Sequence, residues 1–401
     1  MTRTTLLFLL CLLTLQAHAG GRLSRPVIFD TDQQAEASEA SAPHSTKSKK
    51  EKKKNKQKEA DEEPEHKWQR LPHEEQQELT HYLQDFMRER GSNQMLLGLR
   101  GDAVSERIAF LHDEYGTKFF LVVRQSCAHL VEPRVLAFTI GGRYGSVSHP
   151  QPFMKMVEAY DSTLLLMSRD SLPAETSLRK VCPADRIIPL LRSIAWGQFP
   201  VTGLYPWQTE PYLSGCGAVA LAQVMFFYRH PDAARGTCSY DTQDGRHVDV
   251  SLEGIPIRWN KMKDHYSRTD RDTAAIAGLV KMCGLALRSS YGPKGTSTLM
   301  RYYRPALTEH FAYADSARFI HKGTEGELFE QVRCEVRAGR PCILCDNNHI
   351  FVCDGIFDEF LHFNLGWSGV SNGWFRTIVP GEPLSGATLI HSAIVGIQPK
   401  K

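Results

Sequence analysis

The chain has 401 residues, of which 42% are apolar and 23% are charged. This length predicts two or three domains, and the apolar content is sufficient for substantial cores. The formal net charge is +3, but the lysine-rich segment 47–58 alone carries +7, so the rest of the chain sums to −4. A folded part this close to neutral argues against a nucleic-acid-binding groove, so we expect no nucleic acid among the partners.

The N-terminus has the pattern of an export signal. Arg3 is followed by an apolar stretch from Leu6 to Leu15 and by the small-x-small sequence Ala17-His18-Ala19. This pattern predicts a signal peptide over residues 1–19, cleaved after Ala19. The apolar stretch is too short to span a bilayer, and no later segment is apolar enough to do so. We therefore expect an exported product, secreted, periplasmic or at the cell surface, without a transmembrane segment.

Composition divides the rest of the chain into three parts. Residues 20–68 are polar and lysine-rich, which predicts a disordered linker. Residues 69–180 form a small α+β unit, and 181–401 form one larger domain. The polar segment 167–190 between them is a candidate site of proteolytic nicking. Periodicity predicts helices around 79–87, 153–160 and 273–287 and strands at 119–124 and 135–140.

Cys216 is the first candidate for chemistry. It follows the pair Ser214-Gly215 and precedes an apolar run that ends before Pro231. The run predicts a buried helix with Cys216 at its start, where the helix dipole lowers the pKa of a thiol and favours the nucleophilic thiolate. The alternative is a buried structural cysteine, since free cysteines are often buried.

A cysteine nucleophile needs a base, and His349 is the best candidate. The segments 349–354 and 360–364 predict two strands joined by a short turn at Gly355–Asp358. A hairpin centred between residues 356 and 357 would place Asn364 directly opposite His349, with the Cβ atoms about 5 Å apart. Asn364 could then accept the imidazole N–H and fix the tautomer. The alternative is a buried strand histidine paired with a neighbouring amide.

Two further residues bear on this assignment. Gln198 is a candidate for stabilising a developing oxyanion, together with the backbone N–H of Cys216. His362 shares a face with Asn364, and we expect it to be a neighbour of the site and not the base.

A zinc site is a second possible use of this region. Cys342, Cys345, His349 and Cys353 are spaced C-x2-C-x3-H-x3-C. On a continuous strand, however, Cys342 and Cys345 point to opposite faces, so we expect no metal here and no cofactor elsewhere. Ten cysteines are present, and nine remain after removal of the signal, so at least one should be free. The pairing of the others stays open.

Several motifs together resemble the streptopain family of papain-like cysteine peptidases. They are WGQ near Gln198, SGCGAVALAQVMFFYRHP around Cys216, YGPKGTS, HIFVCDG, and NLGWSGVSNGWFR after Asn364. The upstream pieces VLAFTIGGRYG and FMKMVEAY resemble the family's inhibitory propeptide. The resemblance covers residues 195–376 most specifically.

The resemblance implies an exported zymogen with a papain-like α+β fold, consisting of a helical part and an antiparallel sheet. Residues 69–180 would be the inhibitory propeptide, and 181–401 an endopeptidase acting on proteins and peptides. Cys216 would be the nucleophile, His349 the general base and acid, Asn364 its orienting group, and Gln198 part of the oxyanion hole. Ser297 and Asn348 would line the substrate cleft.

The chain departs from the family pattern at Leu365, where a tryptophan usually follows the orienting asparagine. The residues after the nucleophile also differ, being Gly217-Ala218-Val219 in place of a run that contains threonine. We expect Leu365 to leave the His349–Asn364 bond less shielded from water. Two other functions remain open: a non-catalytic binding protein on a decayed peptidase scaffold, and a cysteine-dependent acyl- or amidotransferase.

Overall fold

A computed structural model of the chain describes residues 68–130, 133–142, 150–169, 185–201, 211–243, 245–266, 270, 272–292, 295–321, 325–376 and 390–400. The predicted signal peptide and linker lie outside these ranges, as does the predicted domain boundary at 180/181. Among the described residues, no helix is both long enough and apolar enough to cross a membrane.

The N-terminal unit, residues 68–169, consists of a five-stranded antiparallel sheet with a helix on each face. The two helices and the strands expected at 119–124 and 135–140 are confirmed. The elements are β1 (Gln69–Arg70), α3 (His73–Glu89), β2 (Arg100–Ala103), β3 (Ile108–His112), β4 (Lys118–Val123), a 3-10 helix (Gln125–Leu130), β5 (Val135–Ile140) and α4 (Gln151–Arg169).

The C-terminal part begins at residue 185 and has a helical half and a sheet half. The helical half contains β7 (Pro200–Val201), β8 (Tyr212–Leu213), α5 (Cys216–Tyr228), β9 (Thr237–Asp241), β10 (His247–Ser251), α6 (Ala274–Ala286), β11 (Ser290–Gly292), β12 (Gly295–Ser297) and α7 (Tyr303–Pro305). The sheet half contains β6 (Arg186–Ile187), β13 (Arg318–His321), α8 (Glu325–Arg337), β14 (Cys342–Cys345), β15 (Ile350–Phe357), β16 (Phe360–Asn364), β17 (Gly373–Arg376) and β18 (Ser392–Val395).

The two helices expected in this part are confirmed as α5 and α6, but α8 was missed. The sequence analysis predicted no helix beyond residue 287. The apolar residues of α8 nevertheless recur at helical spacing, and Leu328, Phe329, Val332 and Val336 are all buried. This spacing, with Glu330 and Gln331 exposed between the apolar residues, is typical of an amphipathic helix and could have predicted α8 from the sequence.

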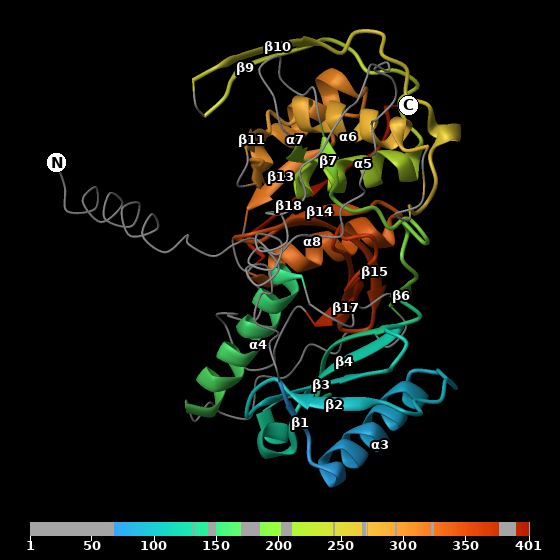
Figure 1. The fold of residues 1–401 in the computed structure, drawn as a ribbon, viewed down its shortest axis with the longest axis vertical. Coiled ribbons are helices and arrows are strands. Elements are labelled where there is room, and N and C mark those ends of the chain that lie inside the picture. The colour runs from blue at the N-terminus through green and yellow to red at the C-terminus, as the bar shows by residue number, and fades with distance from the viewer. Residues whose placement is uncertain are drawn as a thin grey trace, which may run out of the picture.

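One antiparallel sheet runs through both parts of the chain. Its order is β1-β2-β3-β4-β5-β17-β16-β15-β14-β18-β13, with β6 also paired to β15. The junction is formed by β5 and β17, where Trp374 pairs with Phe138 and Phe375 with Ala137. Figure 1 shows the N-terminal unit at one end of the molecule and α5 and α6 at the other, with the C-terminal strands between them.

The core follows the sheet across the junction. On one face, apolar residues of α4 and α8 belong to a single cluster that includes Phe153, Phe329 and Phe375. On the opposite face of the C-terminal strands, α5 and α6 pack over Ile343, Ile350 and Val352. The N-terminal unit is therefore packed as a continuation of the C-terminal sheet, and not as a separate globule.

The junction depends on Phe138, which is 2% exposed and meets the rings of Phe360 at 5.2 Å and Phe86 at 5.8 Å. We predict that Phe138→Ala lowers the free energy of unfolding by roughly 3–5 kcal/mol, because it leaves a cavity between the two parts. Phe319→Ala is the matched control, since Phe319 is 42% exposed on the edge strand β13. Urea denaturation measures both, and equal losses would contradict the role given to Phe138.

Candidate active site

Cys216 is the first residue of α5, and the structure shows why small residues surround it. Gly215 has a φ of 83°, and a Cβ there would lie 2.7 Å from Cγ2 of Thr296. A Cβ at Gly217 would lie 2.9 Å from Thr298. These glycines let β12 and Thr298 lie close against the start of α5, where Cys216 is placed.

The surroundings of the Cys216 sulfur differ from the sequence expectation. Burial raises the pKa of this thiol, while the nearby backbone N–H groups of Ile350 and Gly217 partly offset the increase. Asp346 raises the pKa further through its negative charge. The prediction of a lowered pKa is therefore wrong for this form of the chain, because desolvation outweighs the helix N-terminus. Cys216 is held here as a neutral thiol.

His349 lies immediately before β15 and is 3% exposed. Its Nε2 is 2.7 Å from the carbonyl oxygen of Leu365. Since a carbonyl only accepts, Nε2 carries the hydrogen and Nδ1 keeps a free lone pair. Burial lowers the pKa of His349 to about 4, so the ring is neutral at physiological pH.

The predicted pairing of His349 with Asn364 is wrong. Asn364 lies opposite Val352, because the turn falls at Asp358–Glu359 and a bulge shifts the register between Cys353 and Gly355. The side chain of Asn364 instead donates to the carbonyl of Ile194 at 2.7 Å and accepts the N–H of Gly366 at 3.2 Å. Asn364 thus holds the segment that supplies the Leu365 carbonyl, and acts on His349 through that backbone.

Trp367 shields the His349 ring from water. The sequence analysis expected this shielding to be reduced, because Leu365 stands where the family usually has a tryptophan. Its ring stacks on His349 with centroids 4.3 Å apart and an interplanar angle of 17°. Trp367 is 8% exposed, so it covers one face of the imidazole from water. The sequence analysis did not find this contact, because it depends on how the strands before and after it pair. The tryptophan of the motif NLGW was its sign in the sequence.

Gln198 lies beside the start of α5. The backbone N–H of Ser214 donates to the carbonyl of Phe199 at 2.9 Å, and β7 pairs with β8 just beyond. Gly197 forms a bridge with Trp367 on the other side. Gln198 is half-buried between these two contacts, in the neighbourhood of both Cys216 and His349.

The two predicted cleft residues are both exposed. Ser297 is the last residue of β12, between Thr296 and Thr298, whose side chains lie against Gly215 and Gly217. Asn348 precedes His349 and donates its backbone N–H to Asp346. Ser297 thus lies between two residues that contact the start of α5, and Asn348 lies next to His349 in the chain.

The cysteines and histidine spaced as a possible zinc site are divided between the two sheet faces. Cys342 lies directly opposite Cys353, and both belong to the core under α8. Cys345 packs on the opposite face, under α5. The ring of His362 forms a contact of its own, since its Nδ1 is 2.6 Å from Oδ1 of the buried Asp354.

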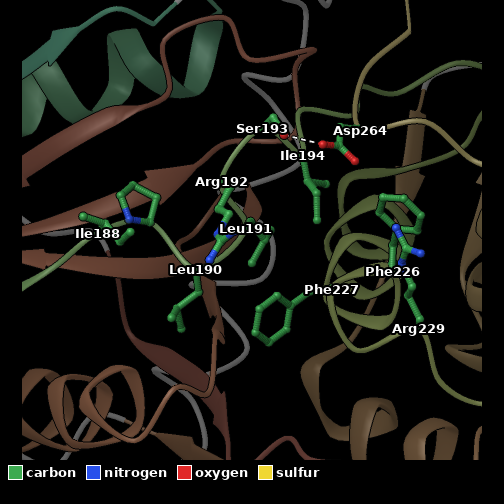
Figure 2. A pocket seen from close by; sticks show the side chains of 11 residues that line it. Ile188, Leu190, Leu191, Arg192, Ser193, Ile194, Phe226, Phe227, Arg229 and Asp264 are labelled. Atoms are coloured by element: carbon green, nitrogen blue, oxygen red, sulfur yellow. Dashed lines mark hydrogen bonds between the residues drawn. The ribbon is translucent and has the colours of Figure 1, made fainter.

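A cavity in the described part of the chain lies away from Cys216. It has a volume of about 390 Å³ and lies at the opposite, C-terminal end of α5, between Phe226, Arg229 and the segment 188–194. Figure 2 shows Ser193 hydrogen-bonded to Asp264 at its rim. A helix of 13 residues is about 20 Å long, so this cavity is distant from the thiol.

Comparison with known proteins agrees with this geometry. Residues 196–375 match the sequence profile described as "Peptidase C10 family". That segment of the chain belongs to the peptidase C10 family, the family of streptopain. The match includes Gln198, Cys216, His349 and Asn364.

Two curated relatives and one solved structure extend the comparison of this chain. It is 26% identical over 299 residues to the thiol protease/hemagglutinin PrtT of Porphyromonas gingivalis, covering 67% of this chain and 34% of that protein. It is 25% identical over 240 residues to streptopain of Streptococcus pyogenes serotype M1, covering 54% of this chain and 59% of streptopain. The chain thus spans between a third and three fifths of the length of these relatives.

The fold matches a fragment of Prevotella intermedia prointerpain A with a TM-score of 0.60 and 22% identity. This match covers 76% of the present chain and 99% of that fragment. The expected α+β, papain-like architecture is therefore confirmed.

The burial of His349 makes stability depend on pH. Its pKa is depressed from an unfolded value near 6.5 to about 4, so the folded state favours the neutral ring. This contribution is fully present above pH 6.5 and is lost as the pH falls from 6.5 through 4. We predict that Cys216→Ala chains lose about 3 kcal/mol more stability between pH 7 and pH 4 than Cys216→Ala/His349→Gln chains do. Urea denaturation at the two pH values measures this difference, and equal losses would contradict a buried neutral His349.

Proposed function

We propose that the chain is an exported cysteine endopeptidase made as a zymogen. The observation that carries the proposal is the packing of Cys216, at the start of α5, against the first residue of β15, directly beside His349. Membership of residues 196–375 in the C10 family supports the same assignment. Its substrates would be proteins and peptides, and the chemistry assigned to these residues requires no cofactor.

In the proposed mechanism Nδ1 of His349 takes the proton from Cys216, and the sulfur attacks the carbonyl carbon of the scissile bond. His349 then gives that proton to the leaving amine, and an acyl-enzyme remains. Water hydrolyses the acyl-enzyme with His349 again acting as base. Gln198 and the backbone N–H of Cys216 would donate to the oxyanion. Leu365 and Trp367 would keep the ring oriented, and Ser297 and Asn348 would border the cleft.

The zymogen proposal rests on the charge state of the pair. Burial raises the pKa of Cys216 and lowers that of His349, which disfavours proton transfer from sulfur to imidazole. The N-terminal unit shares a sheet and a core with the C-terminal part, which suits an intramolecular inhibitor. We assign residues 69–180 to a propeptide and 181–401 to the peptidase, preceded by a signal peptide over 1–19 and a linker over 20–68. The product would act outside the cytoplasm.

We predict that Cys216→Ala abolishes both self-processing and proteolysis, with a loss of roughly 10⁴-fold or more. The matched control is Cys334→Ala, because Cys334 is an exposed thiol on α8. Intact-mass analysis of the full chain under mild reduction, with and without an epoxide thiol inhibitor, measures processing and the adduct together.

Processing blocked by an adduct on Cys216, with the Cys334→Ala chain unaffected, is the expected result. Proteolysis that survives in Cys216→Ala would overturn the assignment. An unprocessed chain that still fails to label after trypsin nicking would favour a scaffold without catalysis. Formation of an amide with an added amine would indicate a transferase.

A further inference from the structure

Asp346 lies in the tight turn that joins β14 to β15, and its side chain organises this turn. Oδ1 accepts the backbone N–H of Asn348 at 2.7 Å and that of His349 at 2.6 Å. The backbone N–H of Asp346 in turn donates to the carbonyl of His349 at 3.0 Å. One carboxylate oxygen therefore fixes the backbone that positions the imidazole.

The other carboxylate oxygen is not used in this way. Oδ2 is buried and has no hydrogen-bond partner, and the residue is only 3% exposed. No lysine or arginine of the described ranges forms an ion pair with it. A buried carboxylate with an unpaired oxygen is costly when ionised, and burial raises the pKa of Asp346 to about 6.

Two thiols lie near Asp346, and Tyr303 and His391 bond to the segments that carry these thiols. Cys216 faces it from α5, and Cys345, the last residue of β14, donates its thiol to the Asp346 carbonyl at 3.1 Å. Tyr303 of α7 hydrogen-bonds the carbonyl of Gly217 beside Cys216. His391, just before β18, donates its backbone N–H to the carbonyl of Cys345 at 3.0 Å. Burial raises the pKa of both neighbouring thiols, and the negative charge of Asp346 raises it further.

We propose that Asp346 is a positioning residue with two roles: its Oδ1 holds the His349 turn, and its unpaired, ionised Oδ2 keeps the proton on the Cys216 sulfur. This inference rests on the proposed function for its consequence in catalysis. When the carboxylate is neutralised by a proton from solvent, the cost of a negative sulfur falls. The sulfur proton can then pass to Nδ1 of His349, with the charge separated between sulfur and ring. Asp346 transfers no proton to or from the substrate and acts only through Cys216 and His349.

The test measures alkylation of Cys216 by iodoacetamide in the full chain, by mass spectrometry of its peptide, from pH 5 to pH 10. All chains carry His349→Ala, so none is processed during the measurement. We predict that Asp346→Asn reacts faster at pH 7, because removal of the negative charge lowers the pKa of the Cys216 thiol, and that the rates converge at high pH. Asparagine keeps an oxygen acceptor for the turn but removes the charge.

The shape of the pH profile separates a charge effect from a structural one. With Asp346 present, the logarithm of the rate should rise more slowly between about pH 5 and 7, where this carboxylate ionises. Asp346→Asn should lose this shallow segment. Asp264→Asn is the matched control, because Asp264 lines the cavity at the far end of α5, and it should retain the shallow segment. If Asp346→Asn lowers the melting temperature markedly, Asp346→Ser, which also offers a turn acceptor without charge, takes its place.

Identical alkylation profiles with and without the Asp346 carboxylate would overturn the inference. A second measurement, self-processing of Asp346→Asn chains with His349 intact, reports on the proposed function separately. Faster alkylation together with faster processing at pH 7 supports both. Faster alkylation without any processing supports the role of Asp346 and contradicts the peptidase assignment.

Discussion

The site depends on the packing of the start of α5 against the start of β15. This contact removes water from both Cys216 and His349, and desolvation acts on the two groups in opposite directions. It raises the pKa of the thiol and lowers that of the imidazole, so both stay neutral. The same packing that brings a nucleophile and a base together thus holds them in an uncharged state. Activation must change the solvation or the charge around this contact.

The orientation of His349 comes mainly from backbone and aromatic contacts. The carbonyl of Leu365 fixes the tautomer, and Trp367 stacks on the ring. Asn364 supports both contacts indirectly, since its side-chain amide forms hydrogen bonds with the backbone of Ile194 and of Gly366 in the same loop. A side chain that was expected to bind the histidine directly is instead a support for the backbone that does so. Replacement of a tryptophan by leucine at position 365 therefore leaves the ring covered.

The continuous sheet gives a physical basis for coupling the N-terminal unit to the site. β5 pairs with β17, β17 with β16, and the last residue of β16 is Asn364. Removal of the N-terminal unit would expose the edge of β17 and part of the core shared by α4 and α8. The strands that carry the His349 support would then lose a neighbour. This arrangement makes the N-terminal unit a structural part of the resting state.

The sequence by itself determined the local features of this protein. The apolar run after Cys216 required a buried helix, and small residues at 215 and 217 allowed close approach. The periodicities of α3, α4, β4 and β5 were sufficient to place them, because each pattern is set by neighbours along the chain. The motifs around Gln198, Cys216 and His349 indicated the family for the same reason.

Only the tertiary structure decided the features that depend on register and burial. The turn at Asp358–Glu359, together with a bulge after Cys353, set Asn364 opposite Val352 instead of His349. Alternation along a strand reveals neither feature, although each changes the pairing of every residue beyond it. The neutral state of Cys216 and the unpaired oxygen of Asp346 arise from desolvation by segments distant in sequence. Local sequence places a thiol at a helix start, but the packing around it sets its charge.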